Sequence, residues 1–193
     1  MIKKLSELNE NQLNQAIDVF IDGFSYIFSK AIRTNKENLH KLFKNSFNYN
    51  MTFAYLQDGE AIGFMGIATY EKRPIKLNRE IFMEILGEKF NTKISFNAMS
   101  AALEKVNVDS SELIYIDYIA TQAEHRSKGV GIKLIEYVRD TMGYKYIKLE
   151  VLSKNDRAIK FYERLGFKVV KIRTDLMMQM NGFGKPIVMQ MEV

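Results

Sequence analysis

The chain of 193 residues contains no cysteine and no run of about 18 consecutive apolar residues. Without cysteine it forms no disulfide, has no thiolate nucleophile and binds no metal through thiolates. The residues after Met1 lack the apolar core of a signal peptide. We therefore expect no membrane partner, and a reducing cytoplasm as the location of the protein.

Blocks of like charge are also missing. Lysine and arginine number 28 against 23 acidic residues, which gives a net charge of +5, and the basic residues are scattered. This balance suits an anionic ligand, but without a basic run we expect no nucleic-acid partner. The two histidines, His40 and His125, stand apart from each other and from any ligand cluster, so we expect no metal.

The composition that is present, 47% hydrophobic and 26% charged, is that of an ordinary globular protein. The length favours one domain over residues 1–193. Hydrophobic periodicity and turn residues predict the following elements. They are strands at 1–6, 52–57, 61–70, 113–121, 146–152, 167–173 and 186–193, and helices at 10–29, 36–47, 129–142 and 156–165. The later series alternates strand and helix, which favours adjacent strands joined by crossover helices.

Residues 73–110 are the least regular part of the chain. Two short amphipathic pieces, at 81–86 and 98–106, indicate a helical insertion between strands. The insertion would cover a site or form a dimer contact, or it would be a decoration without a role. The sequence leaves these readings equal.

The segment from Arg126 to Gly131, with the sequence RSKGVG, lies between a predicted strand and a predicted helix. Glycines let the backbone approach a ligand, and the N-terminus of a helix attracts anions. The pattern is not a P-loop, which needs Gly-Lys-Ser/Thr. It is not a dinucleotide fingerprint either, because Leu134 stands where the third glycine is required and residues separate the strand from the loop.

Two motifs give the chain a family resemblance. The first, Q/R-x-x-G-x-G/A, is matched by Arg126, Gly129 and Gly131. The second, N-x-x-A-x-x-x-Y-x-x-x-G-F, is matched by Asn155, Ala158, Tyr162, Gly166 and Phe167. With both motifs, residues 113–170 resemble the GNAT superfamily of N-acetyltransferases. The valine and proline that usually lead into the first motif are replaced here, and residues 1–110 carry no motif of the family.

The resemblance implies an α+β acyl-CoA N-acyltransferase fold, with a central mixed, mostly antiparallel sheet flanked by helices. It implies acetyl-CoA as co-substrate and transfer of the acetyl group to a primary amine of a small molecule or peptide. Backbone amides of the glycine loop would hold the pyrophosphate, and the end of the preceding strand would pair with the pantetheine arm. The implied binding residues are Ile119, Ala120, Thr121, Arg126, Ser127, Lys128, Gly129, Val130, Gly131, Ile132 and Asn155.

Three side chains are candidates for the chemistry. In the family, a tyrosine at the position of Tyr162 protonates the departing sulfur; by spacing alone, Tyr162 is a core aromatic residue. Asp117 interrupts an apolar strand and is a candidate base, with Glu150 as its rival, or both acids are structural. Asn155 either contacts the ligand or caps a helix, and Ser153 with Asp156 is the alternative cap.

A second function is open at this stage: a domain of the same fold that binds CoA without catalysis, as a sensor or partner module. The sequence does not identify the amine, or decide between acetyl and a longer acyl group. A homodimer is an expectation from family habit.

Overall fold

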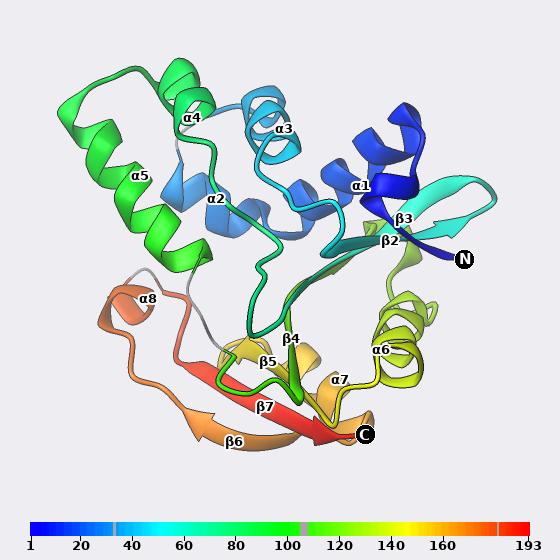
Figure 1. The fold of residues 1–193 in the computed structure, drawn as a ribbon. Helices are drawn as coiled ribbons and strands as arrows, with labels where there is room; N and C mark the ends of the chain where they lie inside the picture. Colours follow the sequence, from blue (N-terminus) through cyan, green and yellow to red (C-terminus); the bar gives the residue numbers. More distant parts are fainter. Residues whose placement is uncertain (33, 105–107, 181) are drawn as a thin grey trace.

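The computed structural model describes residues 1–32, 34–104, 108–180 and 182–193. In this part of the chain, seven strands form one sheet in the order β1-β2-β3-β4-β5-β7-β6 (Figure 1). The strands are β1 (Ile2–Lys4), β2 (Thr52–Gln57), β3 (Glu60–Ala68), β4 (Leu113–Thr121), β5 (Tyr146–Leu152), β6 (Lys168–Ile172) and β7 (Pro186–Glu192). β4 and β5 are parallel, and the other neighbouring pairs are antiparallel. The expected mixed, mostly antiparallel sheet is confirmed.

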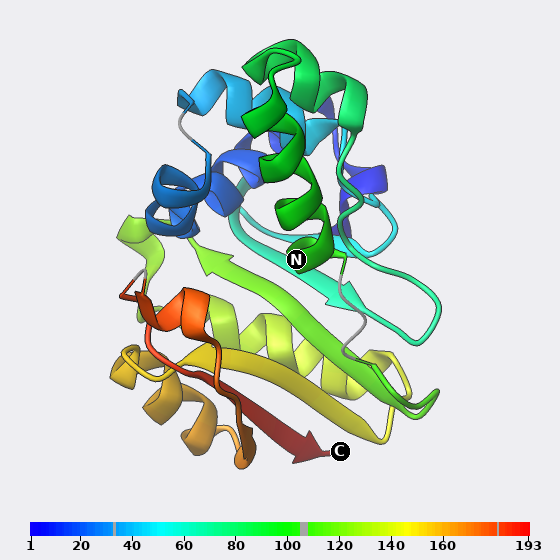
Figure 2. The ribbon, with the colours of Figure 1, turned by 90° about the vertical axis from the view of Figure 1, so that its left-hand side faces the viewer.

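Helices cover both faces of this sheet (Figures 1 and 2). They are α1 (Glu10–Gly23), α2 (Ser25–Ala31), α3 (Lys36–Lys44), α4 (Arg79–Leu86), α5 (Phe90–Leu103), α6 (Val130–Thr141), α7 (Asp156–Arg164) and α8 (Leu176–Met180), with 3₁₀ turns η1 (Leu5–Glu7) and η2 (Ala123–His125). Side chains of α1, α3 and α4 pack in the core on one face, and those of α6 and α7 pack in the core on the other. We call these the α1 face and the α6 face.

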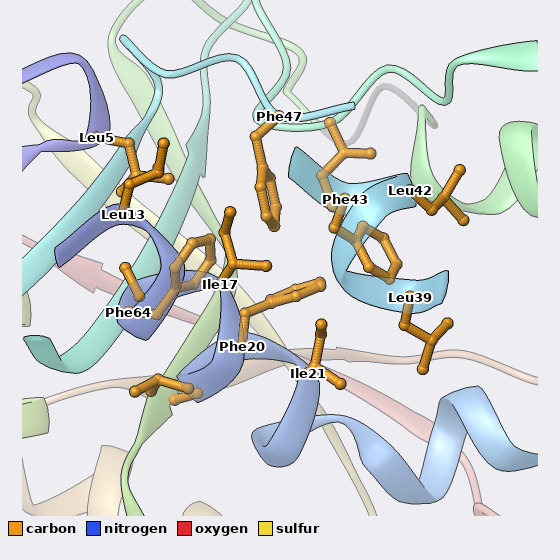
Figure 3. Close-up of a cluster of buried hydrophobic side chains, with 14 of the residues drawn as sticks. Leu5, Leu13, Ile17, Phe20, Ile21, Leu39, Leu42, Phe43, Phe47 and Phe64 are labelled. Carbon is orange, nitrogen blue, oxygen red and sulfur yellow. The ribbon is translucent and has the colours of Figure 1, made fainter. Parts of the chain in front are cut away.

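Phe20 lies at the centre of the core on the α1 face. Its ring centroid lies 4.8 Å from that of Phe43 and 5.0 Å from those of Phe47 and Phe64. These rings come from α1, α3, the segment after α3, and β3 (Figure 3). Burial of such rings contributes several kcal/mol, so this cluster fixes the first helices against the sheet.

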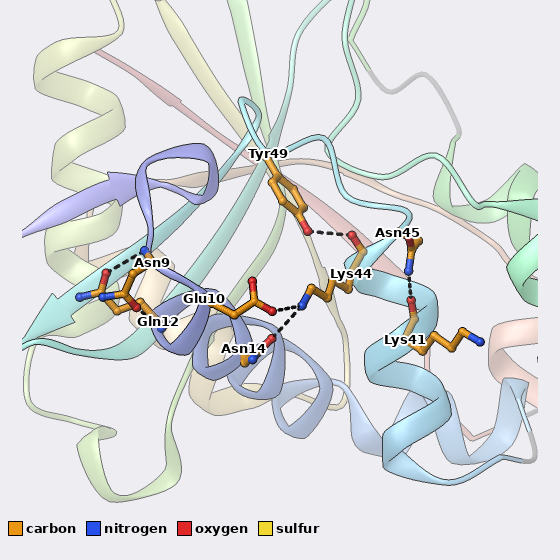
Figure 4. Close-up of polar contacts among 8 residues, drawn as sticks. All are labelled: Asn9, Glu10, Gln12, Asn14, Lys41, Lys44, Asn45 and Tyr49. Carbon is orange, nitrogen blue, oxygen red and sulfur yellow. Dashed lines mark hydrogen bonds and ion pairs between the residues drawn. The ribbon is translucent and has the colours of Figure 1, made fainter.

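Polar contacts hold the outer sides of the same helices (Figure 4). Asn9 caps α1 by accepting a hydrogen bond from the Gln12 amide at 2.9 Å. The Lys44 ammonium bonds Glu10 of α1, while the Tyr49 hydroxyl donates to the Lys44 carbonyl at 2.8 Å. These contacts tie the end of α3 to the start of α1.

Two of the expected helices differ from the prediction by more than one residue at an end. The helix predicted at 10–29 is two helices, because Phe24 (φ −115°, ψ 14°) leaves the helical conformation between α1 and α2. There the Phe24 ring packs 5.6 Å from Tyr118 of β4, and this contact with a distant strand is invisible in the local pattern. The helix predicted at 36–47 ends at Lys44, where Asn45 closes the last turn.

The topology also corrects one expectation. Crossover through α6 joins the adjacent parallel strands β4 and β5, as the pattern predicted. β6, however, does not lie beside β5, because β7 returns between them and pairs antiparallel with both. Side-chain periodicity does not encode which strand fills an edge, so the order was not predictable.

Residues 73–110 do form a helical insertion, which contains α4 and α5 (Figure 2). The piece expected at 98–106 is helical to Leu103, and residues 105–107 lie outside the described residues. α8 was not predicted, since a helix of five residues has too little periodicity to detect.

Candidate active site

The candidate site begins where β4 and β5 stop pairing. Their register runs from Leu113–Tyr146 to Ile116–Leu149. Beyond it, β4 pairs only with β3 and β5 only with β7. We call residues 117–121 of β4 and 150–152 of β5 the strand fork; Figure 2 shows the two strands separating there.

A β-bulge in β4 accompanies the fork. Tyr118 lies opposite Gly66 and Ile116 lies opposite Ile67, so Asp117 is the extra residue between two consecutive pairs. A bulge bends its strand, increases the local twist and re-aims the side chain it carries. The bulge therefore puts the Asp117 carboxyl at the point where the two strands diverge.

The unpaired edge of β4 offers backbone groups to a ligand. The Gln122 N–H donates to the Ile62 carbonyl at 2.9 Å, so these residues form a hydrogen-bonded antiparallel pair. Because such pairs alternate along a ladder, Ala120 also turns its N–H and C=O toward β3. The N–H and C=O of Ile119 and Thr121 then point toward the fork, where the Thr121 carbonyl also accepts a hydrogen bond from the Arg126 Nε at 3.4 Å.

The glycine loop follows η2 and begins α6. Within the described part of the chain, five amides of this short segment donate no hydrogen bond to the protein. They are the N–H groups of Ser127, Gly129, Val130, Gly131 and Ile132. Unpaired amides at a helix N-terminus, together with the helix dipole, form an anion-binding surface.

The two motif glycines serve different purposes. Gly129 has φ +85°, a backbone conformation that favours glycine, and no atom lies within 4 Å of the position of a Cβ, so the space beside it is open. A Cβ on Gly131 would lie 3.3 Å from the Phe161 ring of α7. Gly131 thus makes room for the close packing of Phe161 against α6, whereas we had expected both glycines to make room for the ligand.

Ser127 and Arg157 fix the loop further. Ser127 has φ +65°, which is uncommon outside glycine, and its hydroxyl accepts a hydrogen bond from Arg157 at 2.7 Å. Arg157 lies in the first turn of α7, so the two motifs are joined through side chains. Arg126 and Lys128 are exposed beside the loop, and Arg126 lines a hollow of about 350 Å³ between α1 and the end of β4.

Asp117 lies in a mostly buried position on the fork. Burial raises the pKa of its carboxyl to about 7, with the Arg73 guanidinium opposing the increase and the Glu150 carboxylate adding to it. Its Oδ2 atom is buried without a hydrogen-bond partner among the described residues. A carboxyl in this state takes up and releases protons near neutral pH, as a general base must.

Glu150 lies across the fork on β5. Its neighbours Leu149 and Val151 are buried under α6 and α7, so Glu150 faces the α1 side of the sheet. It accepts a hydrogen bond from Arg173 at 2.7 Å, and both side chains are about three-quarters buried. Glu150 is therefore a paired acid, in contrast with Asp117.

Tyr162 lies in α7 on the opposite, α6 face of the sheet. It is only 7% exposed, and its ring packs 5.2 Å from Phe161 and 5.7 Å from Phe167. Burial raises the pKa of its hydroxyl, so the phenol keeps its proton at neutral pH. Among the described residues, no hydrogen-bond partner of this hydroxyl is found. Tyr162 is therefore a core aromatic residue whose hydroxyl still carries a proton, so the structural and the catalytic interpretations of this residue are compatible.

Asn155 is the N-cap of α7. Its side-chain oxygen accepts a hydrogen bond from the Ala158 amide at 3.1 Å, which confirms the capping interpretation. The alternative cap is wrong, because the Ser153 hydroxyl instead accepts from the Lys185 amide at 2.8 Å.

Arg73 and Arg173 were not selected from the sequence, although each lies near one of the two acids. Both stand in segments without a motif, so only the fold brings them to the fork. Among the described residues there is no group of three or more histidine, aspartate or glutamate side chains arranged to hold a metal ion. The described helices include none long and apolar enough to cross a membrane.

Comparison with known proteins agrees with the motifs. The model of the acetyltransferase (GNAT) family matches residues 21–167. An N-acetyltransferase from Staphylococcus aureus Mu50 has the same fold, with a TM-score of 0.61 at 15% identity; the alignment covers 98% of this chain and 99% of that one.

Two curated proteins are similar over shorter stretches. The 5-NmdU N-acetyltransferase of Pseudomonas phage PaMx11 is 36% identical over 66 residues, which are 34% of this chain and 45% of that protein. The N-alpha-acetyltransferase 50 of Danio rerio is 25% identical over 108 residues, or 52% of this chain and 64% of that protein. The chain therefore spans less than two thirds of the length of either relative.

Proposed function

The chain belongs to the acetyltransferase (GNAT) family, and from this premise we propose that it transfers an acetyl group from acetyl-CoA to a primary amine. The observation that carries the proposal is the set of unpaired amides at Ser127 and Gly129–Ile132, beside the free edge of β4. Five amides without a partner at one helix N-terminus suit a pyrophosphate.

The described residues fit CoA at two further places. Ile119 and Thr121 turn N–H and C=O groups to the fork, where an extended amide-containing arm is able to add as a strand. Arg126 and Lys128 supply positive charge at the exposed side of the loop. Asn155 uses its oxygen for the cap, which leaves its amide N–H₂ as the group to contact the ligand.

Bound acetyl-CoA supplies the acyl carbon and a thiolate leaving group. Asp117 accepts a proton from the amine, whose nitrogen bonds to the acyl carbon as the carbon–sulfur bond breaks. Tyr162 gives its proton to the sulfur, and N–H groups of Ile119 and Thr121 polarise the thioester carbonyl. The two side chains lie on opposite faces of the sheet, so the base and the acid approach the fork from opposite sides.

The test measures binding and turnover separately. Calorimetry with CoA reports binding, and thiol release from acetyl-CoA with a panel of amines reports transfer. Binding with amine-dependent thiol release supports the proposal. Absence of CoA binding contradicts the family function. CoA binding without turnover of any amine favours the non-catalytic module. The observation that favours this second function is that Tyr162 is buried in the core. The single domain, the cytoplasmic location and the homodimer stay predictions.

A further inference from the structure

Two acid–arginine pairs lie on the α1 side of the strand fork, and only one of them is joined by a hydrogen bond. Glu150 and Arg173 are joined by a hydrogen bond of 2.7 Å. Asp117 and Arg73 interact electrostatically, yet no hydrogen bond joins them. Each also has buried polar atoms without a partner among the described residues: Oδ2 of Asp117, and Nε and Nη2 of Arg73.

The fold brings Arg73 to this position through the segment after β3. A Cβ on Gly66 would lie 3.1 Å both from the Pro74 ring and from the Tyr118 ring. Gly66 pairs with Tyr118, next to the bulge at Asp117. Residues 73 and 74 therefore cross β3 directly beside the bulge, on the face that carries the unpaired carboxyl.

The unpartnered atoms of Arg73 are a matched set. Its Nη1 donates to the Thr69 carbonyl at 2.5 Å and the Lys72 carbonyl at 3.1 Å, which fixes the plane of the guanidinium. Nε–H and one N–H of Nη2 point in parallel along the remaining edge. This edge of the guanidinium is the one that binds a carboxylate with two hydrogen bonds.

Buried polar groups in native proteins are nearly always satisfied, so the unpaired donor edge of Arg73 and the unpaired acceptor of Asp117 each call for a partner. A carboxylate satisfies Nε and Nη2 of Arg73, and an amine satisfies Oδ2 of Asp117. One small molecule that carries both a carboxylate and an amine satisfies both residues at once. Its amine is then placed at the proposed base, Asp117.

We propose that the acceptor is an amino acid, bound through its carboxylate by Arg73 and through its amine by Asp117. The proposal deepens the proposed function and rests on it. A diamine or a peptide N-terminus has no carboxylate next to its amine, so either would leave the Arg73 edge unpaired. Arg73 is then a residue that determines specificity, while Asp117 keeps its role toward the proton.

The experiment compares amines in pairs that differ by the carboxylate alone: phenylalanine with phenethylamine, and lysine with cadaverine. Thiol release from acetyl-CoA gives kcat/KM for each. We expect the amino acids to be preferred by about 10- to 100-fold, the range for a charged hydrogen-bonded pair. The Arg73→Met variant should lose this preference mainly through KM, and Arg73→Lys should keep part of it, because lysine retains the charge without the two-pronged edge.

Arg139→Met is the matched control, since Arg139 pairs with its neighbour Asp140 on the outside of α6. It should leave the preference unchanged. Equal rates for both members of each pair in the parent protein, or an equal loss for both in Arg73→Met, would overturn the proposal.

A binding measurement covers the case in which the variant does not fold or the parent turns over no amine. The parent protein is saturated with CoA and titrated by calorimetry with phenylalanine and with phenethylamine. Tighter binding of phenylalanine supports the carboxylate site even without turnover. Equal or tighter binding of phenethylamine contradicts the carboxylate site. In that case, thiol release with any amine would still support the transferase function.

Discussion

The two parts of the candidate site are built in different ways. At the start of α6, the groups placed to hold a ligand are five backbone amides from one short segment, those of residues 127 and 129–132. On the α1 side of the fork, they are side chains from four separate segments: Arg73, Asp117, Glu150 and Arg173. The first part is a local backbone conformation, and the second exists only after the sheet has formed.

This difference decides what each part is able to specify. Backbone amides recognise any anion of suitable shape, so the loop suits a co-substrate that is common to a whole family. Side chains that come from an insertion and from strand ends can be substituted without changing the loop. We therefore expect the second part to select the acceptor, and mutations should separate the two parts cleanly.

The largest effect is expected from Tyr162→Phe. A phenylalanine keeps the packing of the buried ring but has no proton for the sulfur, so kcat should fall by about 10²–10⁴-fold. The affinity for CoA, measured by calorimetry, should change little. Tyr137→Phe, on α6 in the same core, is the control and should retain its activity. Near-parent turnover in Tyr162→Phe would assign Tyr162 to the core alone.

Asp117→Asn should lower kcat/KM by about 10²-fold above pH 7. The base is active when deprotonated, so kcat/KM of the parent should rise with pH and level off above an apparent pKa of about 7. The variant should lose this limb of the pH profile, whereas Glu150→Gln should keep it. The opposite result, with the limb lost only in Glu150→Gln, would make Glu150 the base.

The same carboxyl predicts a pH-dependent stability. Its folded pKa of about 7 lies above the ordinary 3.8, so the folded protein holds a proton that the unfolded chain has released. The stabilisation is fully present below pH 4 and is lost as the pH rises toward 7. Asp117→Asn should therefore gain stability over the parent by roughly 1.4 kcal/mol per pH unit between pH 5 and 7, measured by urea unfolding.

Asp140→Asn provides the control for that measurement. The Arg139 side chain lowers the pKa of Asp140, so the sign of its pH dependence is reversed. A stability difference for Asp117→Asn that does not change with pH would contradict the raised pKa.

A smaller effect is expected from Gly129→Val. The substitution strains a residue at φ +85° and places a side chain over the open amides, so CoA affinity should fall by about tenfold. Gly87→Val is matched to it, because Gly87 has φ +78° and equally open surroundings but lies in the insertion. It should show the same loss of stability with unchanged CoA affinity. Equal affinity losses in both variants would mean that the loop does not hold the ligand.

The part of the fold that was predicted best is the part with local signals. The strands at 52–57, 113–121 and 146–152 were predicted with the limits that the structure gives, because alternation and turn residues mark their ends. The break at Phe24 and the place of β7 depend on contacts between distant segments. No periodicity within one segment reports such contacts.

The residues of the candidate site also differ in whether a local sequence signal revealed them. Asp117 was selected because a charge in an apolar strand stands out, but the bulge that aims it was not visible in the sequence. Arg73 and Arg173 carried no signal at all, since a single arginine in an irregular segment is most often a surface residue.

By itself, the sequence determined the glycine loop, the helix that follows it and the tyrosine of the second motif. These are consequences of short-range chemistry, since a residue without a Cβ, a helix start and a spacing of seven residues act within one segment. Only the tertiary structure decided which arginine meets which acid and which of the two pairs stays open. That outcome depends on how β3, β4, β5 and the insertion are brought together in space, and the free energy that selects it comes from burial of the two cores on either side of the sheet.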